Sequence, residues 1–387
     1  MNKKNELKEK SVFEISRVDI PEWDFDCSID NVDYLTDYQG ATSYCWMYAS
    51  VALLKEYIIK KYSLDNFGFS YSYLQFWDKY ERMKYAVEKI YKNEFKDEDI
   101  VGDLDFLCGD KGDFQIFVSL INKYGIVSSD AMKQTYSITN ASGINWILNN
   151  YLINLIEKVK GNRQLDKDVV LNEVKNLLES FYGNPPEQFE VNIGGNIKIT
   201  PTGFYKKYLD NVLNNYVAVG NFCEEYKYVN KVCEYKKRFN FIDERKSSFI
   251  NLTKKDFIDV VLEQLKHHST YIALKVTDAD LKRGLFHDRL YNFNEVLGVD
   301  VELNKHNFIK YKTSVSEHAL LLTGVDVKDE KIEKWKIKDN NKFVGKDGYC
   351  GLLDGWFDKY VTYVVVDKNI LNKRNITIDS NPQQYLI

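Results

Sequence analysis

The sequence is poor in several features that would assign it to a specialised class. Proline occurs only five times among 387 residues and no low-complexity tract is present, so we expect an ordered chain. The formal net charge of −4 gives no overall positive field that would attract nucleic acid or an anionic membrane. The longest apolar runs, such as HALLLTGV, are far shorter than the ~20 residues of a membrane-spanning helix. We therefore expect neither a membrane protein nor a nucleic-acid-binding protein.

Metal-ligand spacing and an export signal are missing as well. The six cysteines include no Cys-x-x-Cys pair, so the sequence predicts no zinc site, and we expect no metal and no cofactor. The first residues, MNKKNELKEKSVFEIS, are charged throughout and contain no apolar segment of the kind found in signal peptides. We expect a cytoplasmic protein without disulfides.

The sequence contains enough apolar residues for a sizeable core, and their periodicity differs between the two halves of the chain. Hydrophobic residues make up 44% of the chain and aromatic residues 14%, which is enough for two lobes. In the first half, apolar periodicity predicts helices over residues 46–62, 70–93, 111–127, 144–161 and 166–186. In the second half, strand-like runs cover residues 225–242, 270–278, 318–327, 333–339, 348–354 and 360–368, with a helix predicted over 254–268. The pattern predicts an α+β fold with a helical lobe and an antiparallel β lobe.

A candidate nucleophile stands at the start of the first long helix. In DYQGATSYCWMYAS, Cys45 directly precedes the apolar run, and Gln39 lies six residues before it. The unpaired N–H groups at a helix start favour a thiolate, although a lone cysteine is more often a small buried hydrophobe. Gln39 is placed to offer its amide to an oxyanion, together with the backbone N–H of Cys45.

A thiolate of this kind needs a base, and His318 is the leading candidate among the five histidines. It opens the apolar strand HALLLTGVDV, where an imidazole can be held rigidly. A third group should orient the ring. The segment WKIKDNNKFVGKDGY follows shortly afterwards and supplies Asp339 and Asn340 for that role.

At this point the residues resemble a known family, the bleomycin hydrolase and aminopeptidase C branch of the papain-like cysteine peptidases. The similar segments occur in the family's order and cover roughly residues 20 to 370, too much for a chance motif match. They read YQGATSYCWMYA, FSYSYLQFWDKYERMKYAVEKI, CGDKGDFQIFVSLINKYGIVSSDAMKQTYS, LYNFNEVLGV, EHALLLTGVDV and GKDGYCGLLDGWFDKYVTYVVVDK.

The resemblance implies a role for each candidate residue. Cys45 matches the nucleophile, Gln39 the oxyanion-hole glutamine and His318 the base. The family's third residue is the asparagine of an Asn-Ser-Trp-Gly segment, four residues after a tryptophan. Counting from Trp335 reaches Asp339, while a gap shifted by one residue reaches Asn340, so both stay candidates. The C-terminus, ITIDSNPQQYLI, is also shorter than the family's C-terminal arm, which engages the free amine of a substrate.

The resemblance further implies a papain-like two-lobe fold with helical insertions. We predict an N-terminal crossover segment over residues 1–30 and a helical lobe with the nucleophile over 31–135. A helical insertion is predicted over 136–215, a β-rich lobe with the histidine over 216–370, and a C-terminal arm over 371–387. The family's assembly, a ring-like homohexamer with active sites facing an inner cavity, is expected here too.

Three functions follow from these residues. The first is a thiol hydrolase that forms an acyl-enzyme on Cys45 and cleaves peptide bonds, as an aminopeptidase or bleomycin hydrolase does. The second is an acyltransferase or amide synthase that passes the acyl group, for example from a thioester, to an amine. The third is a non-catalytic relative that binds a partner. The intact Cys45, Gln39 and His318 favour an enzyme, whereas the altered loop at Asp339 favours the third.

Overall fold

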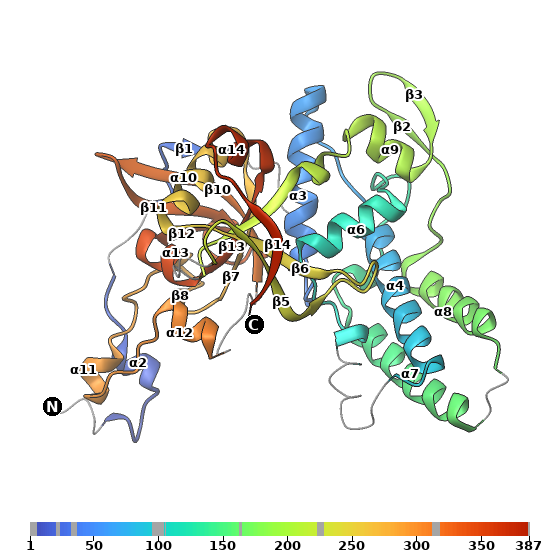
Figure 1. The fold of residues 1–387 in the computed structure, drawn as a ribbon, viewed down its shortest axis with the longest axis horizontal. Coiled ribbons are helices and arrows are strands. Elements are labelled where there is room, and N and C mark those ends of the chain that lie inside the picture. Colours follow the sequence, from blue (N-terminus) through green and yellow to red (C-terminus); the bar gives the residue numbers. More distant parts are fainter. Residues whose placement is uncertain are drawn as a thin grey trace. The chain divides into compact units, whose positions relative to one another are not determined.

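The computed structural model describes residues 6–20, 24–31, 37–94, 104, 106–161, 165–222, 228–311 and 318–385. The chain divides into two compact units (Figure 1). The helical unit comprises Asp37–Asn215 and Arg238–Ser247. The sheet unit comprises Met1–Thr36, Tyr216–Lys237 and Ser248–Ile387. Each unit is therefore built from segments that are distant in the sequence.

Helices dominate the helical unit, and all five helices predicted for the first half of the chain are present. The long helices are α3 (Cys45–Tyr62), α4 (Tyr71–Tyr91), α6 (Phe114–Tyr124), α7 (Ser142–Gly161) and α8 (Lys167–Tyr182). Shorter elements are η1 (Tyr136–Ile138), the hairpin β2 (Phe189–Asn192) and β3 (Asn196–Ile199), α9 (Pro201–Tyr208) and η2 (Val212–Asn215).

α3 is buried on nearly every face, as its apolar sequence predicts. Fourteen of its 18 residues are buried, so the helix runs through the interior of its unit. Two of the other predicted helix ends coincide with glycine. Gly125 follows α6 with φ 72° and Gly183 follows α8 with φ 86°, backbone angles that favour glycine over other residues.

The sheet unit is organised around one mixed sheet. The strands run in the order β14-β5-β6-β4-β13-β7-β10-β11-β12-β9-β8, and β1 pairs with β10 on the side. Their bounds are β1 Ile29–Asp30, β4 Tyr216–Gly220, β5 Lys231–Phe239, β6 Lys246–Asn251, β7 Thr270–Leu274, β8 Ala279–Asp280, β9 Leu285–Phe286, β10 His318–Lys328, β11 Lys331–Lys338, β12 Tyr349–Leu353, β13 Val361–Asp367 and β14 Asp379–Tyr385. Its helices are α2 (Val12–Ser16), α10 (Lys254–Leu265), α11 (Phe293–Leu297), α12 (Lys305–Lys310), α13 (Asp354–Tyr360) and α14 (Lys368–Lys373).

The central strands are antiparallel, as predicted for the β lobe. β13, β7, β10, β11 and β12 pair antiparallel in succession. Among the described strands, parallel pairs are formed by β12 with β9, β4 with β6, and β14 with β5. The alternation of residues in a strand does not depend on the direction of its neighbour, so these pairs were not visible in the sequence.

Some elements of the structure were not predicted. The segment over residues 136–215 was expected to be helical, and it contains α7, α8 and α9 but also the hairpin β2–β3. The hairpin turns at Gly194 and Gly195, whose φ values of 72° and 140° favour glycine. In the sheet unit, the seven-residue helix α13 lies between the strands predicted over residues 348–354 and 360–368, where no helix was predicted. The predicted subdivision of the chain into five segments stays a prediction, and its last two residues lie outside the described part.

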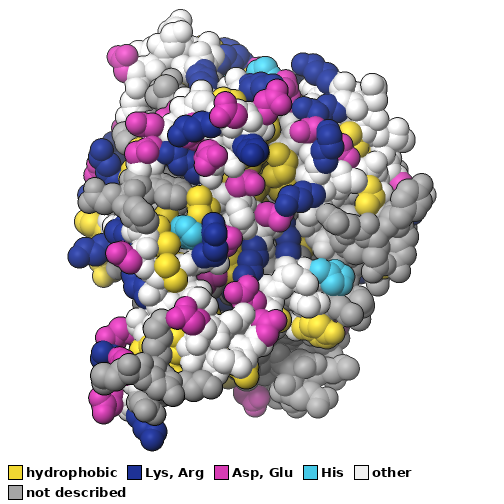
Figure 2. All heavy atoms as spheres, turned by 90° about the vertical axis from the view of Figure 1, so that its left-hand side faces the viewer, with side chains coloured by type: hydrophobic (Ala, Val, Ile, Leu, Met, Phe, Trp, Pro, Cys, Tyr) yellow, Lys and Arg dark blue, Asp and Glu magenta, His cyan; other side chains and the backbone are white. Residues whose placement is uncertain are grey.

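Two further features concern the outer surface. In the part of the chain that the structure describes, no helix combines the length and apolarity needed to cross a membrane. On the face shown in Figure 2, lysines and arginines lie among aspartates and glutamates rather than gathering by sign. This intermixing agrees with the small net charge.

Candidate active site

The candidate nucleophile, Cys45, is the first residue of α3 and is 9% exposed. Its sulfur lies 3.9 Å from the backbone oxygen of Ser43. Tyr44 occupies the N-cap position with φ −82° and ψ 17°, and its side chain does not cap the helix. The thiol therefore stands at the helix start, where backbone N–H groups of the first turn lack intrahelical partners.

Gln39 is held in a tight turn that leads to Cys45. Its side-chain Nε2 donates to the Thr42 carbonyl at 2.8 Å, and the Thr42 hydroxyl donates to the Gln39 carbonyl at 2.9 Å. Gly40 has φ 63°, and a Cβ there would lie 2.4 Å from the Thr139 carbonyl oxygen. Only glycine fits at this position, so the backbone around Gln39 is fixed.

His318 is the first residue of β10, and its side chain is 21% exposed. Its Nε2 lies 3.3 Å from Oδ2 of Asp339, whose side chain is 7% exposed. A ring nitrogen that donates to a carboxylate carries the proton in the neutral imidazole. This contact therefore leaves Nδ1 of His318 as the basic nitrogen.

The pairing of β10 with β11 explains why Asp339, and not its neighbour, meets the ring. Leu321 of β10 pairs with Lys338 of β11, so the antiparallel register continues with residue 320 opposite residue 339. Successive strand residues point to opposite faces, which places residues 339 and 318 on one face and residue 340 on the other. Asn340 accordingly donates from Nδ2 to the Ala319 carbonyl at 3.1 Å.

Asp339 is itself held on both sides. Its Oδ1 accepts from the Asn341 backbone N–H at 2.7 Å, and its own N–H donates to the Gly348 carbonyl at 2.8 Å. Gly348 has φ 88°, which favours glycine at this turn. The carboxylate thus has one oxygen committed to the backbone and the other directed to His318.

The predicted site residues thus form two sets. Cys45 and Gln39 lie in the helical unit, on α3 and the turn before it. His318, Asp339 and Asn340 lie in the sheet unit, at the adjacent ends of β10 and β11. The structure brings Asp339 to His318, and it directs Asn340 to the backbone of β10.

The sequence did not reveal the buried charged residues near the candidate nucleophile. The sequence predicted a helix over residues 70–93, which is α4, but not the burial of its charges. Four charged residues of α4 are at most 3% exposed, namely Asp78, Lys79, Glu81 and Arg82. With Gln75, the residues Asp78, Lys79 and Arg82 repeat at helical spacing, so they form a polar stripe on one face. The helical spacing of these polar residues can be read in the sequence, whereas their burial cannot.

Comparison with known proteins places this chain among peptidases. The sequence profile of the Peptidase C1-like family matches residues 3–386, almost the whole chain. The chain belongs to the Peptidase C1-like family. This membership confirms the predicted relation to the papain-like cysteine peptidases, and with it the predicted α+β class.

Individual members of the Peptidase C1-like family show how far the similarity extends. Aminopeptidase C of Listeria innocua serovar 6a is 28% identical over 362 residues, which cover 89% of this chain and 82% of that protein. Aminopeptidase C of Lactobacillus helveticus is 29% identical, with 86% and 79% covered. The crystal structure of PepW from Lactobacillus rhamnosis HN001 has a TM-score of 0.79 at 25% identity, with 97% and 89% covered.

Proposed function

We propose that this member of the Peptidase C1-like family is a thiol aminopeptidase with Cys45 as its nucleophile. The observation that carries the proposal is the contact between His318 Nε2 and Asp339 Oδ2, because it gives the imidazole a defined orientation and a basic Nδ1. Membership in a family of peptidases supplies the reaction class. The relatives named aminopeptidase C and aminopeptidase E support a peptide substrate with a free amine.

The reaction follows from the chemistry of the proposed groups. The Cys45 thiolate attacks the carbonyl carbon of a peptide bond, and the oxyanion accepts hydrogen bonds from the Cys45 N–H and the Gln39 amide. His318 carries the proton to the departing amine, which leaves an acyl group on sulfur. Water, deprotonated by His318, then releases the acyl group. Asp339 stabilises the imidazolium that forms in both steps.

The carboxylate at position 339 is the observation that favours a second candidate, an acyltransferase. The family resemblance leads us to expect an asparagine there, and Asp339 brings a negative charge to the group that handles the proton. Hydrolysis and amide synthesis share the acyl-enzyme and differ only in the group that attacks it.

A homohexameric assembly and a cytoplasmic location also belong to the proposal and stay predictions.

The test uses aminoacyl amides that release a fluorescent amine. We expect turnover of substrates with a free amino group, little turnover of the same substrates with an acetylated amine, and a Cys45 adduct in the intact mass during turnover. Cys45→Ala should abolish both signals. Release of the acyl group to an added amine instead of water would favour the acyltransferase. Full activity of Cys45→Ala would contradict the whole proposal.

A further inference from the structure

Two pairs of opposite charges are buried in the helical unit close to the nucleophile segment. Lys79, Arg82 and Asp78 on α4 are 0% exposed, and Asp110 in the loop before α6 is 6% exposed. Buried ion pairs are costly to desolvate, and apolar residues of similar size often stabilise a core equally well. Stability alone therefore does not account for these charges.

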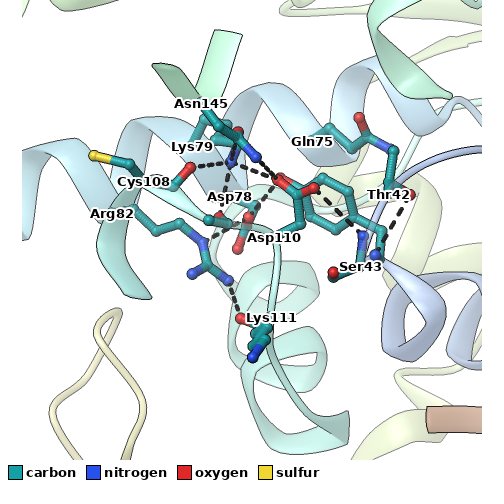
Figure 3. Close-up of polar contacts among 12 residues, drawn as sticks. Thr42, Ser43, Gln75, Asp78, Lys79, Arg82, Cys108, Asp110, Lys111 and Asn145 are labelled. Carbon is teal, nitrogen blue, oxygen red and sulfur yellow. Dashed lines mark hydrogen bonds and ion pairs between the residues drawn. The ribbon is translucent and has the colours of Figure 1, made fainter. Parts of the chain in front are cut away.

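Lys79 holds the loop of residues 108–110 around its ammonium group (Figure 3). Its Nζ lies 2.7 Å from the Cys108 carbonyl oxygen, 2.8 Å from that of Gly109 and 2.8 Å from Oδ1 of Asp110. Asn145 of α7 adds its Oδ1 at 2.6 Å from Nζ and donates from Nδ2 to the same Asp110 oxygen at 2.9 Å. The position of Asp110 thus follows from the position of Lys79.

Asp110 in turn contacts the chain on both sides of Cys45. Its Oδ2 accepts from the Ser43 backbone N–H at 3.4 Å, and its carbonyl accepts from the indole Nε1 of Trp46 at 2.7 Å. Burial alone would raise the pKa of Asp110, but attraction to Lys79 and hydrogen bonds to its carboxylate outweigh this and hold the pKa below its ordinary value. A carboxylate is therefore present at neutral pH.

The second pair contacts the residue directly before the nucleophile. Arg82 Nε donates to Oδ2 of Asp78 at 2.8 Å, and the same oxygen accepts from the Tyr44 hydroxyl at 2.8 Å. Arg82 also donates from Nη2 to the Lys111 carbonyl at 2.6 Å. The carboxylates of Asp110 and Asp78 thus accept hydrogen bonds from Ser43 and Tyr44, and the backbone carbonyl of Asp110 accepts one from Trp46. These contacts flank Cys45, which carries the thiol.

We propose that Lys79 and Asp110 are positioning residues for the reaction at Cys45. They fix the backbone around Cys45, so that its N–H points to the place where the oxyanion forms. This inference rests on the thiol chemistry proposed above. Misplacing a reacting group by about 1 Å can cost ~10²-fold in rate, so loss of the pair should lower kcat and leave KM nearly unchanged.

The test compares two double variants, because removing one partner of a buried pair leaves an unpaired charge and can unfold the chain. Lys79→Met/Asp110→Asn keeps an amide oxygen that can accept from the Ser43 N–H. Lys79→Met/Asp110→Leu removes that acceptor. The matched control is Glu81→Gln, since Glu81 is 3% exposed on the same helix but pairs with Lys123 at 2.7 Å, away from residues 43–46. Iodoacetamide also alkylates the other five cysteines and the thiols of unfolded chains. Rates are therefore expressed per folded molecule, measured by circular dichroism, and alkylation of Cys45 is followed by peptide mass spectrometry.

We expect kcat of Lys79→Met/Asp110→Leu to fall at least about tenfold below that of Lys79→Met/Asp110→Asn, with KM within about threefold, and Glu81→Gln to keep the wild-type kcat. Alkylation by iodoacetamide needs no oxyanion hole, so its rate should change little. A wild-type kcat in the folded Lys79→Met/Asp110→Leu variant would overturn the inference. An equal loss of alkylation and turnover would do the same, and a wild-type chain without turnover would overturn the proposed function as well.

Discussion

At the scale of single residues, strand alternation selects the partner of His318. Residues 318 and 339 lie on one face of the β10–β11 pair, and residue 340 lies on the other. We therefore expect Asp339→Ala to lower kcat/KM by roughly 10²-fold or more, since the imidazole loses its orienting group. Asn340→Ala should instead cost about 1 kcal/mol of stability, because it removes one buried hydrogen bond to the Ala319 carbonyl.

Steady-state kinetics and urea unfolding of the two variants measure these effects separately. Asp339→Asn is the informative control, because it keeps a hydrogen-bonding group beside His318 and removes only the charge. Most of the activity should remain in this variant. A larger kinetic loss in Asn340→Ala than in Asp339→Ala would show that the asparagine orients the ring.

Gln39 gives a second prediction at this scale. Gln39→Ala removes the side-chain contact with the Thr42 carbonyl but keeps the one from the Thr42 hydroxyl to the carbonyl of residue 39, so the turn before Cys45 should persist. Gln39→Ala should lower kcat roughly 10²-fold, the usual effect of losing one oxyanion-hole donor, with the alkylation rate of Cys45 unchanged. Stopped-flow acylation and iodoacetamide kinetics on the same preparation provide both values. An unchanged acylation rate would exclude Gln39 from the oxyanion hole.

Asp110 predicts how stability depends on pH. Its folded-state pKa is lower than the ~3.9 of an aspartate in an unfolded chain. The stabilisation from its ionised form is therefore present above about pH 4 and is lost as the pH falls through the folded-state pKa. Urea unfolding of the wild type between pH 6 and 3 (about one measurement per half unit) should show a steeper loss below pH 4 than unfolding of Lys79→Met/Asp110→Asn. Parallel curves would show that Asp110 is not the titrating group.

At the scale of elements, α3 packs closely against the loop before α6 at Trp46. A Cβ on Gly112 would lie 2.5 Å from Cε2 of the Trp46 indole, a rigid ring that hydrogen-bonds to Asp110. Gly112→Ala should therefore displace the indole and destabilise the fold by about 1–3 kcal/mol, the usual cost of overpacking. Tryptophan fluorescence and urea unfolding report the change.

Gly143 near the start of α7 supplies the matched control. A Cβ there would meet no atom within 4 Å, and the residue is helical. Gly143→Ala should be neutral or stabilising by up to about 1 kcal/mol, since alanine loses less backbone freedom than glycine in a helix. If both variants had the same stability, contact between the loop and the indole would not matter for the fold.

Local periodicity predicted the elements whose signal lies within one segment. The helices α3, α6 and α8 show apolar spacing and glycine or lysine at their ends, so sequence alone located them. The burial of the charges on α4 depends on the loop that folds over them, and no local pattern contains that information. The same spacing would describe a solvated helix face equally well.

For a similar reason, the sequence alone could not decide whether Asp339 or Asn340 faces His318. The β10–β11 hairpin turns at Asp329 and Glu330, with φ values of 48° and 62°. Between that turn and His318 the register shifts twice, between Asp326 and Val327 and between Leu322 and Gly324. Each shift exchanges the faces of the strand, and the two cancel. An alignment with one uncertain gap cannot resolve a face that depends on two bulges, whereas the contact distance does.

At the scale of the whole molecule, no local sequence pattern could predict which segments of the chain belong to which unit. The sheet unit contains the first residues of the chain because β1, only two residues long, pairs with the central strand β10. Residues 238–247 belong to the helical unit, although the residues before and after them belong to the sheet unit. A two-residue strand that pairs with a distant segment leaves no periodic signal in the sequence. The predicted domain boundaries could therefore only follow the change from helical periodicity to strand-like alternation.

Assembly is the property of the whole molecule that can be tested most directly. The resemblance to the bleomycin hydrolase and aminopeptidase C branch leads us to expect a homohexamer, so light scattering at micromolar concentration should give about six times the 45.4 kDa mass of the chain. Cys45→Ala should give the same mass, because the nucleophile is not needed for subunit contacts. Dilution should not dissociate a large obligate interface, whereas a weak one would yield monomers. A monomer at micromolar concentration would contradict the expected assembly, and the proposed chemistry at Cys45 would then have to operate without an enclosed cavity.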